Sequence, residues 1–326
     1  MGEKMKQKTI LITGSNGFIY SNFIKYVSTN FPQYRLVGID ALLFEHSKRN
    51  TFEHPNYKFY LGDFADTQFI EQVFRIERPD WVVHSGAQSN VGASIASALP
   101  FVHSNITGTQ VMIDASLKYG VEKFFYIDTD EIYGHLHGHD LPWTEQSPLC
   151  PRNPYSASKA CGSLLTMAAH ETHGLQYLIT RCSNNYGKNQ SHANLVPQII
   201  VRILKNLPIN IHGNGQHMRE WLYAMDNCEA VMTILHKSPM NEIYNVGADV
   251  EMTNLETVEC IGKLMNKTPK IKHITDRPGH DLRYKLNINK INELGWKPNT
   301  SLEQGMLQTI KWYEQNIEFY SNLINE

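Results

Sequence analysis

The sequence predicts an α/β fold, with a Rossmann-like, doubly wound parallel sheet followed by a smaller C-terminal α/β lobe. Three observations support this prediction. Short apolar runs alternate with segments of helical periodicity from the first residues onward. A glycine-containing turn separates the first apolar run from the first helical segment. The chain of 326 residues is also too long for one ordinary domain.

The first half of the chain carries the regular alternation. Buried parallel strands are predicted at residues 9–13, 35–40, 57–61, 81–84, 124–127 and 177–181. Helices are predicted from Phe18, after an Asp66 N-cap, across 103–118 and across 154–173. Gly120 and Gly174 follow the last two helices as stop signals.

After about residue 186 the rhythm loosens, and prolines and glycines separate shorter elements. We therefore expect residues 1–186 to form a dinucleotide-binding domain. Residues 187–326 are expected to form mainly a substrate-binding lobe, with some segments returning to the first domain. Such a lobe would cover the carboxyl ends of the strands, where clefts of open α/β sheets lie.

Composition excludes several classes of protein. The net charge of -2 and the scattered lysines and arginines argue against nucleic-acid binding. Five widely spaced cysteines without a C-x-x-C pair argue against a disulfide framework or a zinc site, and no metal site is predicted. No window approaches 18 continuous apolar residues, so no membrane span is expected. These features predict a soluble protein of the cytoplasm.

The turn after the first predicted strand has the pattern of a dinucleotide site. Gly14 allows a tight turn, and Gly17 lets the backbone approach a pyrophosphate at the helix N-terminus. Asp40 closes the next strand, where a carboxylate would hold a ribose 2'-hydroxyl and repel a 2'-phosphate, which favours NAD over NADP. The third glycine position holds Tyr20, whose phenol must point aside or push the helix outward.

A second pattern opens the helix at 154–173. Tyr155 and Lys159 are four residues apart and therefore share a helical face. Lys159 could then reach the cofactor ribose and lower the pKa of the Tyr155 phenol, which would make the phenol a usable base.

At this point the chain resembles the extended short-chain dehydrogenases/reductases, and among them the nucleoside-diphosphate-glucose 4,6-dehydratases that act on dTDP- or UDP-glucose. The resemblance runs from about Thr9 to about Tyr313. It rests on seven motifs, which are Asp128-Thr-Asp-Glu-Ile-Tyr-Gly134, Asn153-Pro-Tyr-Ser-Ala-Ser-Lys159, Arg181-Cys-Ser-Asn-Asn-Tyr-Gly187, Arg219-Glu-Trp-Leu-Tyr223, Tyr244-Asn-Val-Gly247, Asp276-Arg-Pro-Gly-His-Asp281 and Leu294-Gly-Trp-Lys-Pro298.

The resemblance implies a lyase that removes water from the sugar with the help of bound NAD. Tyr155 would take the O4' proton, and Thr129 would hydrogen-bond the 4-hydroxyl. Glu131 would remove the C5 proton, and Asp130 would protonate the C6 hydroxyl as it leaves. Two adjacent carboxyl groups in different protonation states are the pattern that splits pKa values.

Further contacts are implied only by the resemblance. The cofactor positions, besides Tyr155 and Lys159, are Gly14, Asn16, Gly17, Phe18, Ile19, Asp40, Asp63, Phe64, Ser85, Gly86, Ala87, Ser104 and Asn185. The substrate positions, besides Thr129, are Ser89, Asn184, Leu195, His212, Arg219, Asn254, Arg277 and His280. Asn105 matches a helix asparagine that shapes the active site.

Three residues depart from the family pattern. Asp128 replaces a serine and brings a third carboxylate beside the pair. Asn194 replaces a lysine that helps to bind the diphosphate in many relatives. His212 stands where thymidine-linked enzymes often have tyrosine and resembles the uridine-linked dehydratases of rhamnose synthesis. This last difference favours UDP-glucose over dTDP-glucose.

Two alternatives remain at this stage. A UDP-sugar epimerase or decarboxylase of the same superfamily would keep Tyr155 and Lys159 but would not need the pair Asp130 and Glu131. A non-catalytic NAD-binding protein would tend to lose Tyr155 and Lys159. By analogy, the helix after Pro100 and the helix that carries Tyr155 are expected to pair in a homodimer.

Overall fold

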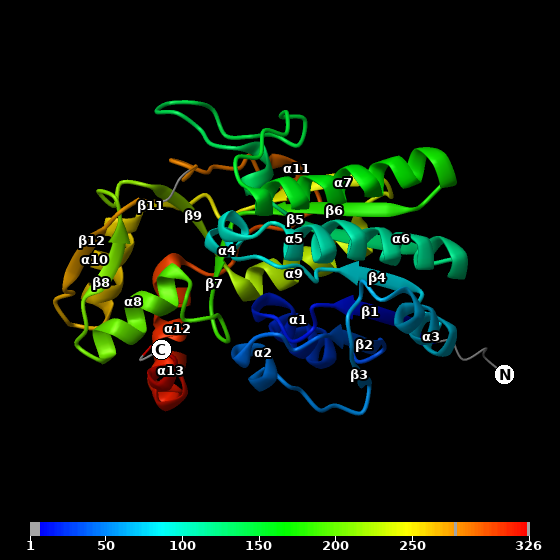
Figure 1. The fold of residues 1–326 in the computed structure, drawn as a ribbon, viewed down its shortest axis with the longest axis horizontal. Coiled ribbons are helices and arrows are strands. Elements are labelled where there is room, and N and C mark those ends of the chain that lie inside the picture. Colours follow the sequence, from blue (N-terminus) through cyan, green and yellow to red (C-terminus); the bar gives the residue numbers. More distant parts are fainter. Residues whose placement is uncertain (1–6, 277–278, 325–326) are drawn as a thin grey trace.

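A seven-stranded sheet forms the centre of the protein (Figure 1). The structure is a computed structural model that describes residues 7–276 and 279–324. The strand order is β10-β6-β5-β4-β1-β2-β3, and every neighbouring pair is parallel. The strands are β1 (Thr9–Thr13), β2 (Arg35–Asp40), β3 (Tyr57–Leu61), β4 (Trp81–His84), β5 (Lys123–Thr129), β6 (Tyr177–Cys182) and β10 (Glu242–Val246). This order confirms the predicted Rossmann-like sheet and puts its switch point between β1 and β4.

Helices cover both faces of this sheet. One apolar core joins the sheet to α1 (Phe18–Asn30), α9 (Ala224–Lys237) and α11 (Asn289–Glu293). A second core on the opposite face joins it to α3 (Thr67–Glu77), α6 (Gly108–Tyr119) and α7 (Pro154–His173). Asp66 caps α3 through the backbone N–H groups of Gln68 and Phe69, as predicted. The helix predicted at 154–173 is also confirmed.

The helix predicted at 103–118 is interrupted. A short α5 (Leu99–Phe101) leads into a π-helical segment, η1 (Val102–Thr107), before α6 begins. Asn105 lies in this segment with its side chain buried, donating to the Gln88 carbonyl at 3.0 Å and to the Ser158 hydroxyl at 2.8 Å. The wider turn directs Asn105 inward toward α7, a common use of π-helical turns. Hydrophobic spacing does not distinguish such a turn from an α-helix.

The remaining elements form a smaller lobe beside the carboxyl ends of the strands (Figure 1). Its two small sheets have the orders β11-β9-β7 and β12-β8. Their strands are β7 (Asn184–Tyr186), β8 (Ile209–His212), β9 (Met218–Tyr223), β11 (Glu251–Thr253) and β12 (Ile271–Ile274). Its helices, which share a third apolar core, are α8 (Leu195–Leu204), α10 (Asn254–Leu264), α12 (Leu302–Gln315) and α13 (Ile317–Ile324).

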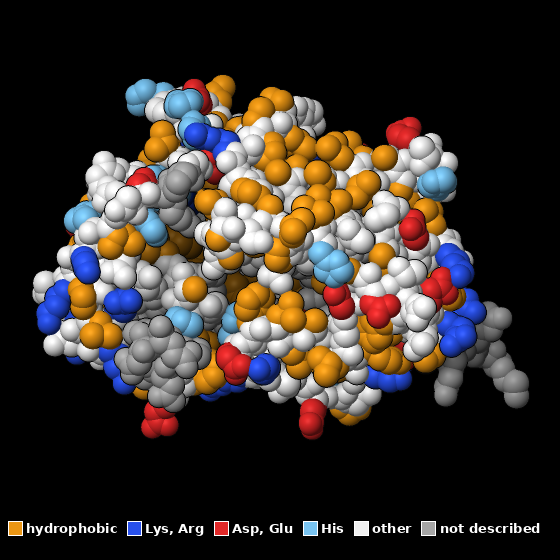
Figure 2. All heavy atoms as spheres, viewed as in Figure 1, with side chains coloured by type: hydrophobic (Ala, Val, Ile, Leu, Met, Phe, Trp, Pro, Cys, Tyr) orange, Lys and Arg blue, Asp and Glu red, His pale blue; other side chains and the backbone are white. Residues whose placement is uncertain are grey.

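Three short elements lie near the junction of sheet and lobe. They are α2 (Glu45–Arg49), α4 (Val91–Ala96) and the 3-10 turn η2 (Asp130–Tyr133). Figure 2 shows the surface hollowed between the lobe and the sheet domain. Across residues 7–276 and 279–324, no helix is long and apolar enough to cross a membrane.

Candidate active site

The turn between β1 and α1 is shaped to receive a phosphate group. Gly14 has a φ of 65°, and a Cβ there would lie 2.7 Å from the Gly86 Cα, so only glycine fits. Gly17 is the N-cap of α1, and no side chain caps its first N–H groups. A helix N-terminus with uncapped N–H groups, reached over a glycine turn, favours an anion.

Asp40 lies beside this turn at the end of β2. Its carboxylate accepts the backbone N–H of Asn16 at 3.0 Å and that of Leu42 at 2.8 Å. Burial raises the pKa of Asp40, while these two hydrogen bonds act in the opposite direction. The carboxylate is thus held next to the glycine turn, where ribose hydroxyl groups of a dinucleotide would lie.

Tyr20 does not obstruct the turn. Its ring is buried in the core that α1 shares with the sheet, with its centroid 5.4 Å from that of Phe23. The phenol thus points aside, into the core. No residue in the described part of the chain hydrogen-bonds its hydroxyl, and burial, followed by the thiols Cys182 and Cys228, raises its pKa.

Several other predicted cofactor positions gather at the same switch point. Phe64 packs against Gly86 and Gly108, since a Cβ on either glycine would meet its ring within 2.5 Å. Thr13 accepts the backbone N–H groups of Ser85 and Gly86 through its hydroxyl oxygen, which ties β4 to the turn. The other predicted positions lie in α1 (Phe18, Ile19), beside the turn (Asn16), in the loops after β3 and β4 (Asp63, Ala87), in η1 (Ser104) and in β7 (Asn185).

Asp130 lies at the mouth of the sheet, where β5 passes into η2. The side chain is 1% exposed, its Oδ1 accepts the Thr129 hydroxyl at 3.3 Å, and its Oδ2 has no hydrogen-bond partner within the described residues. Burial raises the pKa of Asp130 well above its usual range, and the neighbouring carboxylates Glu131 and Glu220 raise it further. Burial therefore favours the protonated form of Asp130, whereas Glu131 beside it is only half-buried.

Tyr155 and Lys159 begin α7, which Asn153 caps by accepting the Ser156 N–H at 2.9 Å. Lys159 is buried, whereas Tyr155 is half-buried, and the expected lowering of the Tyr155 pKa is not seen. Desolvation and then Glu131 raise that pKa. The Lys159 ammonium group donates to the Ile127 carbonyl at 2.6 Å. A positive charge brought close to Tyr155 would lower its pKa again.

A further group of predicted substrate residues lies in the smaller lobe. Arg219 of β9 donates to His280 Nε2 at 2.9 Å and to the Asp281 carbonyl at 3.0 Å, and its guanidinium lies 4.5 Å from the centre of the Tyr284 ring. The structure thus brings together Arg219 and His280, two predicted substrate positions. Arg277, predicted to join them, lies outside the described residues.

His280 belongs to a cluster with two residues, His217 and Asp276, that were not predicted as site residues. The Asp276 carboxylate accepts a hydrogen bond from His280 Nδ1 at 2.6 Å. Its other oxygen lies 3.1 Å from His217 Nε2. Ligand atoms of these three residues lie within 4.8 Å of one another, close enough for a metal ion. However, the two imidazole rings stack with centroids 3.8 Å apart, and Arg219 donates to Nε2, which places the His280 proton on Nδ1. The geometry therefore favours hydrogen bonds from the two histidines to Asp276 over ligation of a metal ion.

The remaining predicted substrate positions are more dispersed. His212 donates from Nδ1 to the Thr275 carbonyl at 3.0 Å, and its ring centroid lies 6.1 Å from that of His280. Asn254 begins α10 and donates its backbone N–H to the His217 carbonyl. The others lie in the loop before α4 (Ser89), in β7 (Asn184) and at the start of α8 (Leu195), where the exposed Asn194 is the N-cap.

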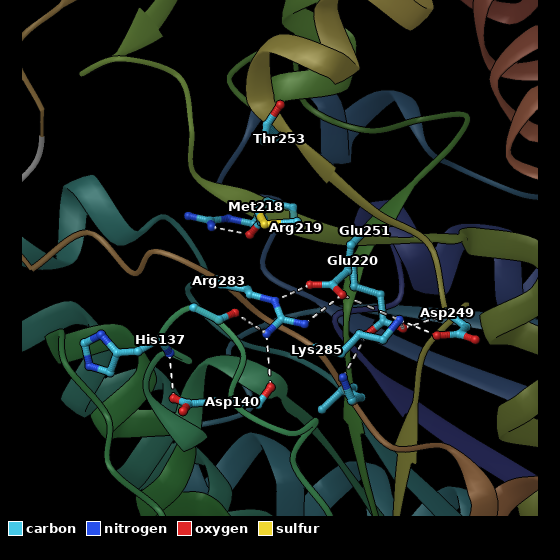
Figure 3. Close-up of polar contacts among 12 residues, drawn as sticks. His137, Asp140, Met218, Arg219, Glu220, Asp249, Glu251, Thr253, Arg283 and Lys285 are labelled. Carbon is cyan, nitrogen blue, oxygen red and sulfur yellow. Dashed lines mark hydrogen bonds and ion pairs between the residues drawn. The ribbon is translucent and has the colours of Figure 1, made fainter.

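Glu220 is a further residue that sequence reasoning missed. It is fully buried in β9 and accepts the backbone N–H groups of Ala248, Asp249 and Leu286. Lys285 lies 4.0 Å away and also pairs with Asp249 (Figure 3). This ion network ties the loops of the lobe together and places a second carboxylate near Asp130.

Comparison with known proteins agrees with this geometry. A family model described as GDP-mannose 4,6 dehydratase matches residues 11–309. The chain belongs to this dehydratase family.

Two relatives from this family are each 40% identical over 93% of the chain. One is the low-salt glycan biosynthesis protein Agl12 of Haloferax volcanii, of which 98% is covered. The other is a dTDP-glucose 4,6-dehydratase of Haemophilus influenzae, of which 97% is covered. A trifunctional UDP-glucose 4,6-dehydratase of Arabidopsis thaliana is 36% identical over 98% of the chain, which spans 49% of that longer protein.

Solved structures give the same picture. The dTDP-glucose 4,6-dehydratase of Bacillus anthracis in complex with NAD is 36% identical with a TM-score of 0.89, covering 97% of this chain and 99% of that one. The dTDP-glucose 4,6-dehydratase of Streptomyces venezuelae is 33% identical with a TM-score of 0.91, with the same coverage. A UDP-glucose 4-epimerase of Thermotoga maritima, 27% identical over 95% of this chain and 99% of that one, reaches 0.87, so the fold alone does not distinguish the two reactions.

Proposed function

We propose that this protein is an NAD-dependent nucleoside-diphosphate-glucose 4,6-dehydratase. The observation that carries the proposal is the buried Asp130 with its raised pKa next to Glu131, at the same end of the sheet as Tyr155 and Lys159. The dehydratases among its relatives and structural neighbours support it.

The residues at the switch point fit NAD. The turn at Gly14, which has no side chain and packs closely against Gly86, leaves room for a pyrophosphate beside the uncapped N-terminus of α1. Asp40 suits a ribose without a 2'-phosphate. When bound, NAD supplies the hydride acceptor and donor together with a positive charge near the active site. That charge would oppose the rise in the Tyr155 pKa and so help the phenol to lose its proton.

The side chains then divide the proton transfers of an elimination. Tyr155 takes the proton of the 4-hydroxyl group, which Thr129 holds by a hydrogen bond. With the C4 hydride passed to bound NAD, the sugar would carry a 4-ketone that acidifies C5, and Glu131 removes the C5 proton. Asp130 gives its proton to the C6 hydroxyl, which leaves as water. Glu131 returns a proton to C5 when the hydride returns to C6, and the product is the 4-keto-6-deoxy sugar nucleotide.

The lobe would bind the diphosphate and the base. Arg219 and His280 lie together, Arg219 is near enough to Asp130 to oppose the rise in its pKa, and a guanidinium pairs well with phosphate oxygens. Arg277, Asn254, Leu195, Asn184 and Ser89 complete the proposed substrate contacts. Because of His212, we propose uridine rather than thymidine as the base. We also propose that residues 1–186 bind the cofactor and that residues 187–326 mainly bind the substrate.

An epimerase of the same fold is the second candidate. Its chemistry needs Tyr155 and Lys159 but no group that protonates a leaving hydroxyl. A buried carboxyl group with a raised pKa is costly to keep without a use, so Asp130 favours the dehydratase.

Product mass distinguishes these reactions. The purified protein is incubated with UDP-glucose or dTDP-glucose, each with and without added NAD. We expect a product that has lost one water and faster turnover of UDP-glucose. An isobaric product would instead identify an epimerase, and faster turnover of dTDP-glucose would overturn the base preference alone.

We also propose that the protein is a homodimer. Ile95 of α4, Leu99 of α5, Val102 of η1 and Leu164 of α7 are each 40–77% exposed, and Figure 2 shows hydrophobic side chains gathered over these helices. A second copy of the chain would cover this face. Light scattering of Leu99→Lys should show monomer, whereas Leu141→Lys, at an 84% exposed loop leucine, should stay dimeric. A monomeric wild type would contradict the proposal.

A further inference from the structure

Asp128 is a buried carboxylate that the proposed reaction does not use. It lies in β5 two residues before Asp130 but faces α7, and it is 2% exposed. Its Oδ1 accepts the Thr129 backbone N–H at 2.9 Å, and its Oδ2 accepts the hydroxyl of Ser163, which is itself fully buried. Asp128 is therefore anchored between the strand and the helix.

Lys159 lies one helical turn before Ser163 on the same side of α7. Its side chain is almost fully buried, and its ammonium group donates to the Ile127 carbonyl and lies 4.3 Å from the centre of the Tyr126 ring. The Tyr126 hydroxyl in turn donates to the Lys159 carbonyl at 3.1 Å. Tyr126 and Ile127 of β5 thus contact the backbone and the head of one lysine, and Asp128 follows them in the strand. A carbonyl and a ring face attract an ammonium group but cannot neutralise it.

The titratable groups around Lys159 come from every element packed against it. They are His84 of β4, Tyr126 and Asp128 of β5, Asp130 and Glu131 of η2, Arg181 and Cys182 of β6, and Tyr155 of α7.

Most of these groups cannot supply a negative charge. Burial lowers the pKa of His84 to about 3 and raises that of Cys182 to about 12, so both are neutral near pH 7. Tyr126 and Tyr155 are neutral phenols for the same reason. Burial raises the pKa of Asp128, but Lys159 is the largest influence that lowers it.

We propose that Asp128 is a positioning residue that keeps Lys159 charged and directed into the active site, with Ser163 holding the Asp128 carboxylate in place. The role of Lys159 in the reaction rests on the proposed function, but the placement of Asp128 beside the carbonyl that Lys159 contacts, and against Ser163 one turn further along α7, does not. A buried ammonium group without a counter-charge gives up its proton more easily.

The proposal predicts the direction in which the Lys159 pKa changes when Asp128 loses its charge. Burial lowers the pKa of the lysine, and Asp128 is the first influence that raises it again. Removing the negative charge should therefore let Lys159 lose its proton at lower pH. In Asp128→Asn, which keeps the size and one acceptor oxygen, the Lys159 titration midpoint should fall by about one pH unit or more.

The test is a pH titration of lysine side chains by NMR, in protein labelled with ¹³C at the lysine ε-carbon and without substrate. Lys159→Met assigns the signal. A fall in the Lys159 midpoint of more than about half a unit in Asp128→Asn supports the proposal, and a smaller change overturns it. If Asp128→Asn does not fold, Asp128→Ser replaces it under the same criterion.

Ser163→Ala is the matched control. It removes the anchor of Asp128 but keeps the charge, so the Lys159 midpoint should move less than in Asp128→Asn. An equal shift in both variants would overturn the counter-charge role, because packing alone would then explain the effect. Since the titration uses no sugar nucleotide, absence of dehydratase activity would contradict the proposed function without affecting this result.

Discussion

Two buried carboxyl groups, Asp130 at the end of β5 and Glu220 in β9, are partnered in opposite ways. Both have pKa values raised by burial. Glu220 accepts three backbone N–H groups and has Lys285 beside it, and these contacts oppose the effect of burial. Asp130 has one long hydrogen bond from Thr129 and an oxygen without a partner in the described chain. The lobe uses its carboxylate to hold loops together, whereas the sheet keeps an acid whose proton remains available.

The largest effect is expected from removing the proton of Asp130. Asp130→Asn should lower the rate of water loss by about 10²–10⁴-fold, the usual contribution of a positioned acid. Hydride transfer and exchange of the C5 proton should continue, because Tyr155 and Glu131 are unchanged. Mass spectrometry in D₂O measures both partial reactions. Water loss at the wild-type rate would remove Asp130 from the proposed reaction.

The same variant should change stability in a pH-dependent way. The folded-state pKa of Asp130 lies above its unfolded value, so the stability that its proton contributes is present at low pH and lost as pH rises. Relative to wild type, Asp130→Asn should gain up to about 1.4 kcal/mol of unfolding free energy per pH unit above about pH 4. Urea unfolding at pH 5, 6.5 and 8 measures this gain. A constant difference between the two proteins would show that Asp130 is ionised in the fold.

The next effect should come from breaking the paired network. Lys285→Met leaves Glu220 buried without its nearest cation and should cost about 2–4 kcal/mol of unfolding free energy. Lys48→Met is the control, because Lys48 and its partner Glu45 are both more than half exposed, and it should cost less than about 1 kcal/mol. Equal losses in the two variants would mean that the network does not stabilise the lobe.

The smallest effect should come from removing only the hydroxyl of Tyr20, a buried group of the sheet domain that has no hydrogen-bond partner among the residues that the structure describes. Tyr20→Phe should change the unfolding free energy by less than about 1 kcal/mol and leave NAD affinity unchanged. Tyr20→Gly introduces the residue that is usual at this position of dinucleotide-binding turns. It should lower the unfolding free energy by about 3 kcal/mol or more, because it leaves a cavity in the core. A stabler glycine variant would contradict the packing role of the ring.

The sheet domain could be predicted from sequence because its signals are local. Apolar runs gave all six of its first strands, and the Gly14 turn and the Tyr155 helix lie where their spacing indicated. β10 was not predicted, since the short run from Glu242 to Val246 does not show which sheet it joins. The direction of the Tyr155 pKa shift was also wrong, because spacing along a helix does not reveal how deeply a phenol is buried.

The contacts of the lobe could not be predicted because they join distant residues. Nothing near His217 in the sequence points to Asp276 or His280, and Glu220 is hidden within a motif chosen for its arginine. Asp128 was noticed as unusual, but its face of β5 depends on packing against α7. Pairings of this kind are set by tertiary structure and leave no periodic trace in the chain.

The place of β10 has a consequence for synthesis of the protein on the ribosome. All six residues of β6 are buried, and β10 covers the outer edge of that strand. During translation this apolar edge exists before residues 242–246 have been made, an interval on the order of several seconds. Until then β6 is an unpaired edge of the kind that recruits other strands. The nascent chain therefore passes through an interval in which the edge of β6 is open to pairing with other strands.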